Sequence, residues 1–148
     1  MKFVIQRVKS SSVKVDGKIV GKINHGYNVL IGINEKDNKE IADKMIKKLI
    51  NLRIFNDENG KMNLNIKKVN GEILAISQFT LCAYMKDGNR PSFIYAGKPD
   101  MSKPLYEYIV DELKKEISHV ETGVFGAHMD VDIQNDGPVT IVLDSNEI

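Results

Sequence analysis

The spacing of apolar residues changes along this chain, and that change constrains the fold more than any other feature of the sequence. Up to about residue 33, apolar side chains occur in short strand-like runs bounded by turn residues. From about residue 38 to 50, and again from 102 to 117, they recur every three or four residues, the spacing of an amphipathic helix. A chain with two such helices among many strands is predicted to adopt an α+β fold.

The predicted strands are bounded by turn signals. Residues 3–8 and 13–15 are rich in β-branched residues, and Asp16-Gly17 is the strongest short hairpin signal, so residues 18–23 are expected to form the return strand. Further strands are predicted at 27–33, 72–79, 129–133 and 139–143, the last two separated by a turn at 134–138.

The first helix is predicted to begin near Asn38, and the second at Ser102 as its N-cap, with Pro104 tolerated in the first turn. Their buried stripes are expected to be Ile41, Met45, Ile46, Leu49 and Ile50 in the first, and Leu105, Ile109, Leu113 and Ile117 in the second. Residues 84–99 contain too many glycines and prolines for regular structure. No repeat or linker divides the chain, so residues 1–148 are expected to form a single domain.

Composition restricts the classes of function. The chain has 148 residues, of which 42% are hydrophobic and 28% charged, and its formal net charge is +1. Such a balance argues against coating nucleic acid through bulk charge, but it permits contact with the end of an RNA. No apolar run approaches the ~20 residues of a membrane span, and no secretion signal is visible. We expect a soluble, cytoplasmic protein that binds neither membranes nor DNA.

Metal chemistry finds little support in the sequence. The three histidines, His25, His119 and His128, match no metal-ligand spacing. A single cysteine, Cys82, cannot form a multi-cysteine metal cluster or an internal disulfide. We therefore expect no metal and no other cofactor.

Nucleophilic catalysis by a side chain is also poorly supported. Ser77, Thr80 and Ser92 carry hydroxyl groups, but no Gly-x-Ser-x-Gly motif is present and no histidine is evidently placed as a base. Cys82 follows an apolar strand without a basic neighbour, which is typical of a buried, inert thiol. A triad-type esterase is accordingly the weakest of the catalytic hypotheses.

The predicted strand that ends in Ser77–Leu81 offers a different kind of chemistry. It can present backbone N–H groups at an open sheet edge, and such donors stabilise a carbonyl oxygen that becomes an oxyanion. Alternatively, Ser77 and Thr80 merely cap the strand end. Spacing alone leaves both interpretations open.

Two further features are unusual. Gly137-Pro138 is interpreted most simply as part of a hairpin turn with a trans bond, since most X-Pro bonds in folded proteins are trans. Arg7 shares a strand face with the apolar Phe3 and Ile5. A guanidinium there must reach solvent or donate to backbone carbonyls, because it cannot lose its charge.

Through these segments the sequence resembles the D-aminoacyl-tRNA deacylase (D-tyrosyl-tRNA deacylase) family from end to end. Six segments carry the resemblance, in the order found in the family. They are residues 5–8 (Ile-Gln-Arg-Val), 53–55 together with 60–64, 77–81 (Ser-Gln-Phe-Thr-Leu), 89–93, 123–127 and 135–140 (Asn-Asp-Gly-Pro-Val-Thr).

The resemblance implies a homodimer of a β-barrel-like α+β fold, with mixed sheets, two main helices and two active sites at the dimer interface. It implies hydrolysis of the ester that joins a D-amino acid to the 3′ end of tRNA, and of mischarged glycyl-tRNA. Because the RNA's own 2′-hydroxyl assists water attack in this view, no cofactor is needed.

The resemblance also assigns roles to residues at the catalytic pocket. Ser77, Gln78, Phe79 and Thr80 would line it, with the N–H groups near Phe79 and Thr80 receiving the ester carbonyl. Thr80 would position the substrate rather than attack it. Two further positions match pocket-lining residues of the family, namely Phe125 and Met129.

Selection between D- and L-amino acids is implied at a second segment. The Gly137-Pro138 bond would be cis, and the pair would be held by Arg7 and reach into the other subunit's site. An L side chain would collide with it, whereas a D side chain would point to solvent. The alternative, from another class, is a non-catalytic module that binds the tRNA end or a synthetase on the same fold.

Overall fold

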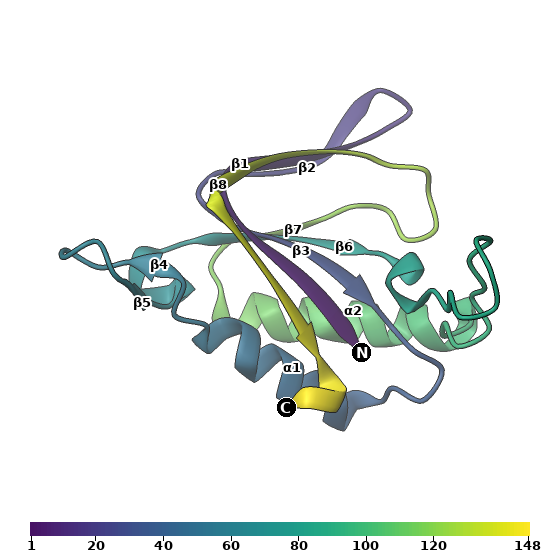
Figure 1. Cartoon of the computed structure of the whole chain (residues 1–148). Helices are drawn as coiled ribbons and strands as arrows, with labels where there is room; N and C mark the ends of the chain where they lie inside the picture. The colour runs from purple at the N-terminus through teal and green to yellow at the C-terminus, as the bar shows by residue number, and fades with distance from the viewer.

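A twisted sheet of six strands folds partly around itself, and two helices cover one of its faces (Figure 1). The computed structural model describes residues 1–148. The sheet consists of β1 (Lys2–Val15), β2 (Lys18–Ile23), β3 (Gly26–Gly32), β6 (Glu72–Ser77), β7 (Val120–Thr122) and β8 (Asp130–Asp144). The helices are α1 (Lys39–Asn51) and α2 (Pro99–Glu116), and a small separate hairpin is formed by β4 (Phe55–Asn56) and β5 (Met62–Leu64). None of the helices has the length and apolar character that crossing a bilayer demands.

Strand β1 is shared by three partners. Its first half pairs antiparallel with β3 and its second half with β2, while β8 follows its other edge from Lys2 to Lys14. The turn between β1 and β2 has positive φ at both Asp16 and Gly17, as the predicted two-residue hairpin requires. Strands β3, β6 and β7 run parallel to one another, so the sheet contains both parallel and antiparallel pairs.

The sheet nearly closes into a barrel where β2 crosses β7. A side chain at Gly21 would place its Cβ 2.5 Å from the carbonyl oxygen of Thr122, so only glycine permits this approach. The enclosed space is filled by a small apolar cluster made of Val8, Val13, Ile23, Leu74 and Ile76. The predicted α+β class with a barrel-like sheet and two helices is confirmed.

The larger core lies between the sheet and the helices. Helix α1 begins where it was predicted to begin, and Asn38 is its N-cap, because the Asn38 side-chain oxygen accepts the N–H of Ile41 at 3.0 Å. The apolar stripes of both helices are buried as their spacing predicted, from Met45 and Leu49 in α1 to Ile109 and Leu113 in α2. These side chains pack against the sheet in one cluster of 24 buried residues.

The predicted start of the second helix is wrong by four residues. Helix α2 begins at Pro99, with Lys98 in the N-cap position, and Ser102 lies inside its first turn. Pro99 suits the first helical position, since its fixed φ is helical and its missing N–H would have no partner there. The Ser102 hydroxyl instead donates to the carbonyl of Lys98 at 3.0 Å.

The predicted turn at 134–138 is also wrong, because β8 runs through it without reversing. Both halves of β8 pair with β1, and the partners Gln6–Thr140 and Val8–Asn135 leave Arg7 alone opposite the four residues of 136–139. The turn-forming residues therefore interrupt the ladder as a bulge rather than as a hairpin. The strand predicted at 72–79 ends earlier, at Ser77, because Phe79–Cys82 form a 3-10 turn.

The Gly21 contact yields a test of the barrel closure. In Gly21→Ala the added methyl group would force β2 away from the Thr122 carbonyl, and we expect the free energy of unfolding to fall by about 1–3 kcal/mol. Urea denaturation measures this loss. Lys18→Ala, an exposed position on the same strand, is the control and should stay within about 0.5 kcal/mol of the parent. Parent-like stability of Gly21→Ala would mean that the two strands are free to separate.

Candidate active site

An open cavity of about 560 Å³ lies where the ends of β3 and β6 meet the start of α2 and the loop before β8. Its floor is apolar, formed by Ile31, Ile33 and Ile76. Its walls come from four separate parts of the chain, which are residues 77–79, 93–102, 125–129 and Val131. The cavity thus combines an apolar base with the polar end of a strand, a combination typical of small-molecule sites.

Three of the predicted pocket residues reach this cavity from the end of β6. Ser77, Gln78 and Phe79 all line it. The N–H of Gln78 donates to the carbonyl of Ile31 at 2.8 Å, and beyond that bond the chain leaves the sheet for the 3-10 turn. The sheet therefore fixes the backbone direction at the point where the polar residues begin.

The 3-10 turn leaves two backbone donors available. Within the turn, the N–H groups of Leu81 and Ala83 donate to the carbonyls of Gln78 and Thr80. The N–H groups of Phe79 and Thr80 lie at the start of the turn, where the turn offers no carbonyl three residues back to accept from them. No side chain caps them either. Two adjacent N–H groups without a partner are suited to hold one oxygen atom.

Thr80 stands apart from the other predicted residues. It is exposed, does not line the cavity, and its hydroxyl accepts a hydrogen bond from the side-chain amide of Gln78. An amide cannot remove a proton from a hydroxyl, so this arrangement does not activate Thr80 as a nucleophile. Cys82 is no better placed, because burial raises the pKa of its thiol, which donates to the carbonyl of Ile33.

Phe125 and Met129 line the cavity as predicted, and each is held by a neighbour. The Phe125 ring packs against Tyr106 at a centroid distance of 5.9 Å, and the Tyr106 hydroxyl donates to the carbonyl of Ala75 at 2.8 Å. Burial raises the pKa of Tyr106, which keeps it a donor. The Met129 sulfur fills the space that Gly123 leaves by having no side chain.

Three lining residues with aromatic or ionisable side chains were not predicted as site residues from the sequence alone. Phe93 contacts Phe79 edge-to-face at 4.9 Å, Lys98 precedes α2, and His128 lies in the loop before β8. Phe93 falls in the 89–93 segment that carried the family resemblance, which was the one available signal. Lys98 and His128 have no motif around them, and only the tertiary fold brings them here.

The remaining candidates lie elsewhere. The His25 ring packs on Phe55, and His119 lies 3.4 Å from the carboxylate of Glu121. Ser92 exchanges two backbone hydrogen bonds with Tyr84. No group of three or more His, Cys, Asp or Glu side chains is arranged to hold a metal ion.

Arg7, Gly137 and Pro138 form a second centre on β1 and β8, outside the lining of the cavity. The Gly137-Pro138 bond is cis, as the resemblance implied. Gly137 has φ +122°, and a Cβ there would lie 3.0 Å from the Arg7 guanidinium and 2.9 Å from the side chain of Val139. Both residues of the pair are exposed, so their carbonyls are available to a neighbouring molecule.

Arg7 holds the start of this segment through its buried side chain. It is only 7% exposed, and its Nε donates to the carbonyl of Asp136 at 3.3 Å and lies 3.2 Å from the Asp136 carboxylate. Its Nη1 donates to the carbonyl of Ile54 at 2.7 Å and to the side chain of Asn56 at 3.3 Å. The buried guanidinium thus links β8 to β4 by donating to carbonyls, which is one of the two outcomes that the sequence left open.

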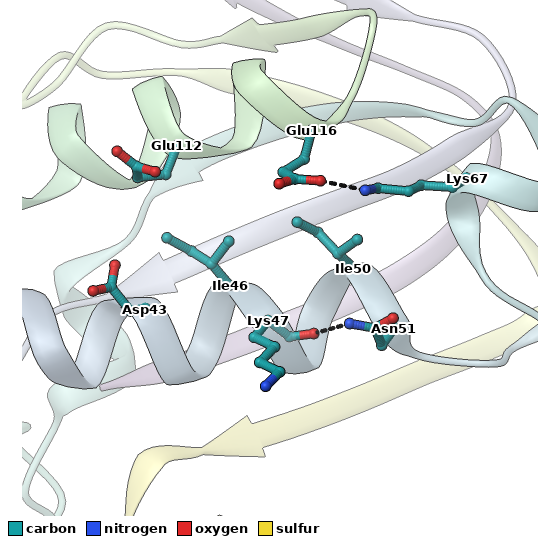
Figure 2. Close-up of a pocket in the computed structure, with 8 residues that line it drawn as sticks. All are labelled: Asp43, Ile46, Lys47, Ile50, Asn51, Lys67, Glu112 and Glu116. Carbon is teal, nitrogen blue, oxygen red and sulfur yellow. Dashed lines mark hydrogen bonds and ion pairs between the residues drawn. The ribbon is translucent and has the colours of Figure 1, made fainter.

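A second hollow, of about 240 Å³, lies between α1 and α2 (Figure 2). Its lining is mostly charged, and Figure 2 shows Lys67 and Glu116 paired across it. Glu112 is likewise paired, with Lys115, and Asp43 accepts a hydrogen bond from Tyr108. Most of the charged groups in this hollow therefore have partners, and none of the predicted site residues lies here.

Comparison with known proteins identifies the family of the chain. The family model described as "D-Tyr-tRNA(Tyr) deacylase" matches residues 4–144. The chain is 57% identical to the D-aminoacyl-tRNA deacylase of Clostridium acetobutylicum, covering 100% of this chain and 99% of the relative. It is 54% identical to the enzyme of that name from Aquifex aeolicus, over the full length of both.

Two solved structures share the fold of this chain. One, titled "c-Myc DNA Unwinding Element Binding Protein", superposes with a TM-score of 0.93 at 41% identity, covering 97% of this chain and 98% of the other. Another, titled as a probable eukaryotic D-amino acid tRNA deacylase, reaches a TM-score of 0.83 at 16% identity over 96% and 97%, a likeness of fold. With the match spanning nearly the whole sequence, the chain belongs to the D-Tyr-tRNA(Tyr) deacylase family.

Proposed function

We propose that this protein hydrolyses the ester bond of D-aminoacyl-tRNA and releases the free D-amino acid and the tRNA. The observation that carries the proposal is the pair of unpartnered N–H groups of Phe79 and Thr80 beside the cavity. They suit an ester carbonyl whose oxygen gains negative charge during hydrolysis. The names of the relatives at 57% and 54% identity support the same reaction.

In this reaction water is the nucleophile, and the RNA part of the substrate assists it. Water attacks the ester carbonyl carbon, and the carbonyl oxygen becomes an oxyanion held by the two N–H groups. The bond between that carbon and the 3′-oxygen of the ribose then breaks, and the 3′-oxygen leaves with the proton that the water has lost. No imidazole, carboxylate or amine bonds to the Thr80 hydroxyl, so a protein base is not evident there. The neighbouring 2′-hydroxyl of the RNA assists the attack instead, which makes RNA the required substrate. We place this reaction in the cytoplasm.

Selection against L-amino acids comes from a second copy of the chain. In our proposal the protein is a homodimer, and the carbonyls of Gly137 and Pro138 enter the partner's cavity against the α-carbon of the substrate. An L side chain meets them, whereas a D side chain and the hydrogen of glycine do not. The exposure of this segment and its position outside its own cavity support a role in trans.

The homodimer has further support from the surface. Phe79 at the cavity and Val142 on β8 are large apolar side chains that are 55% and 64% exposed. Exposed apolar groups of this size often mark an interface. The solved relative whose title names DNA binding does not lead us to propose DNA as a partner, because a net charge of +1 provides no broad basic field.

The first test is hydrolysis of matched D-Tyr-tRNA and L-Tyr-tRNA by the purified protein with a chelator present. We expect release of the D-amino acid alone, at a rate the chelator leaves unchanged, because backbone donors need no metal. Binding of the charged tRNA without cleavage of either ester would favour the non-catalytic module. Cleavage of both esters would overturn selection by the Gly137-Pro138 segment.

Replacement of Thr80 separates positioning from nucleophilic attack. In Thr80→Ala the backbone N–H remains and only the contact with Gln78 is lost, so we expect kcat/KM for D-Tyr-tRNA to fall by about tenfold or less. A loss of about 10⁴-fold or more would identify Thr80 as a nucleophile. Thr80→Ser, which retains the hydroxyl, serves as the control in single-turnover kinetics.

Replacement of Gly137 tests the selective segment. In Gly137→Ala the new methyl group meets Arg7 and Val139 at a φ that disfavours alanine, so the segment must move. We expect the D/L ratio of kcat/KM to fall by about tenfold or more, mainly because the L-ester is admitted. Gly60→Ala, at a position that also has positive φ (+75°) but nothing within 4 Å, should keep the parent ratio.

A further inference from the structure

The bulge that carries Gly137 and Pro138 is closed by its own two ends. Asn135 and Thr140 are the last residues of β8 that pair with β1 on either side of it. The Asn135 side-chain amide donates to the Thr140 hydroxyl at 2.9 Å, and its oxygen accepts the N–H of Val139 at 3.3 Å. Gln6 on β1 lies within 3.5 Å of the same hydroxyl. We call the Asn135 and Thr140 side chains the clasp.

The clasp supplies hydrogen bonds at a point where the β1–β8 ladder makes none. Four residues face Arg7 alone, so they lack ordinary strand pairing, and Pro138 has no N–H to donate. Arg7 holds only the first of them, through the carbonyl and carboxylate of Asp136. The other end is held at Val139 by Asn135. With both ends fixed, the two intervening residues lose most of their freedom to move.

We propose that Asn135 is a positioning residue for the choice between D- and L-amino acids, acting with Thr140 to set where Gly137 and Pro138 meet the substrate. This role rests on the proposed function. Asn135 is half-buried and Thr140 exposed, so their hydrogen bonds contribute little to overall stability. Their loss is therefore expected to change selectivity more than folding.

The experiment compares kcat/KM for D-Tyr-tRNA and L-Tyr-tRNA in a small set of variants. In Asn135→Ala both hydrogen bonds of the clasp are lost, and the D/L ratio should fall by about tenfold, the size of one or two hydrogen bonds, through faster cleavage of the L-ester. Asn135→Asp retains the acceptor for Val139 and can accept from the Thr140 hydroxyl, so it should restore the parent ratio. Thr140→Val should give an intermediate ratio.

The control is Gln134→Ala, which removes the neighbouring exposed amide and its contact with Ser10 but leaves the clasp intact. It should keep the parent ratio. An unchanged ratio in Asn135→Ala would overturn the positioning role alone, as would an equal loss of both activities together with a lower melting temperature. If the parent protein cleaves D-Tyr-tRNA without selecting against the L-form, or cleaves neither, the proposed function itself fails and this role fails with it.

Discussion

Strand β1 pairs along both of its edges, and the arrangement of the remaining elements follows from that pairing. Its 14 residues hold β3 and then β2 on one edge and β8 on the other. Because β8 follows β1 from end to end, any excess residue in β8 must leave the ladder. It leaves opposite Arg7, and the exposed segment with Gly137 and Pro138 is the result.

This arrangement buries the charged side chain of Arg7. Its guanidinium cannot lose a proton, so it requires acceptors inside the protein. The carbonyls of Ile54 and Asp136 provide them, together with the carboxylate of Asp136. A buried cation with partners on two elements is strongly directional, and it orients the bulge in a way that an apolar side chain could not. The same residue therefore serves the core and, in our proposal, the selection of the substrate.

Local signals predicted much of the fold. The helical spacing and the Asp16-Gly17 hairpin depend on residues close in sequence, and both are confirmed. The turn expected at 134–138 failed because turn-forming residues mark an interruption without saying whether the chain reverses. That outcome depends on β1, which is more than 100 residues away and long enough to pair with both halves.

The site, like the fold, could be predicted from the sequence only where the signal is local. The sequence drew attention to residues 77–81, whose backbone makes the two free donors, and to Arg7 as a donor to carbonyls. Lys98 and His128 share the same cavity, but they come from separate segments, and only packing brings them together. That the Gly137-Pro138 segment lies away from the cavity of its own chain is also a tertiary fact that no local pattern contains.

A site whose working groups are peptide N–H and C=O groups has a consequence for its response to acidity. Peptide groups do not gain or lose protons between pH 5 and 9, unlike the imidazole or carboxylate of an acid–base enzyme. If these backbone groups do the work, as we propose, they contribute no ionisation to the rate and produce no bell-shaped profile of the kind such enzymes show. The acidity of the attacking water, of the ribose hydroxyl and of the substrate's own amino group would set how the hydrolysis varies with pH.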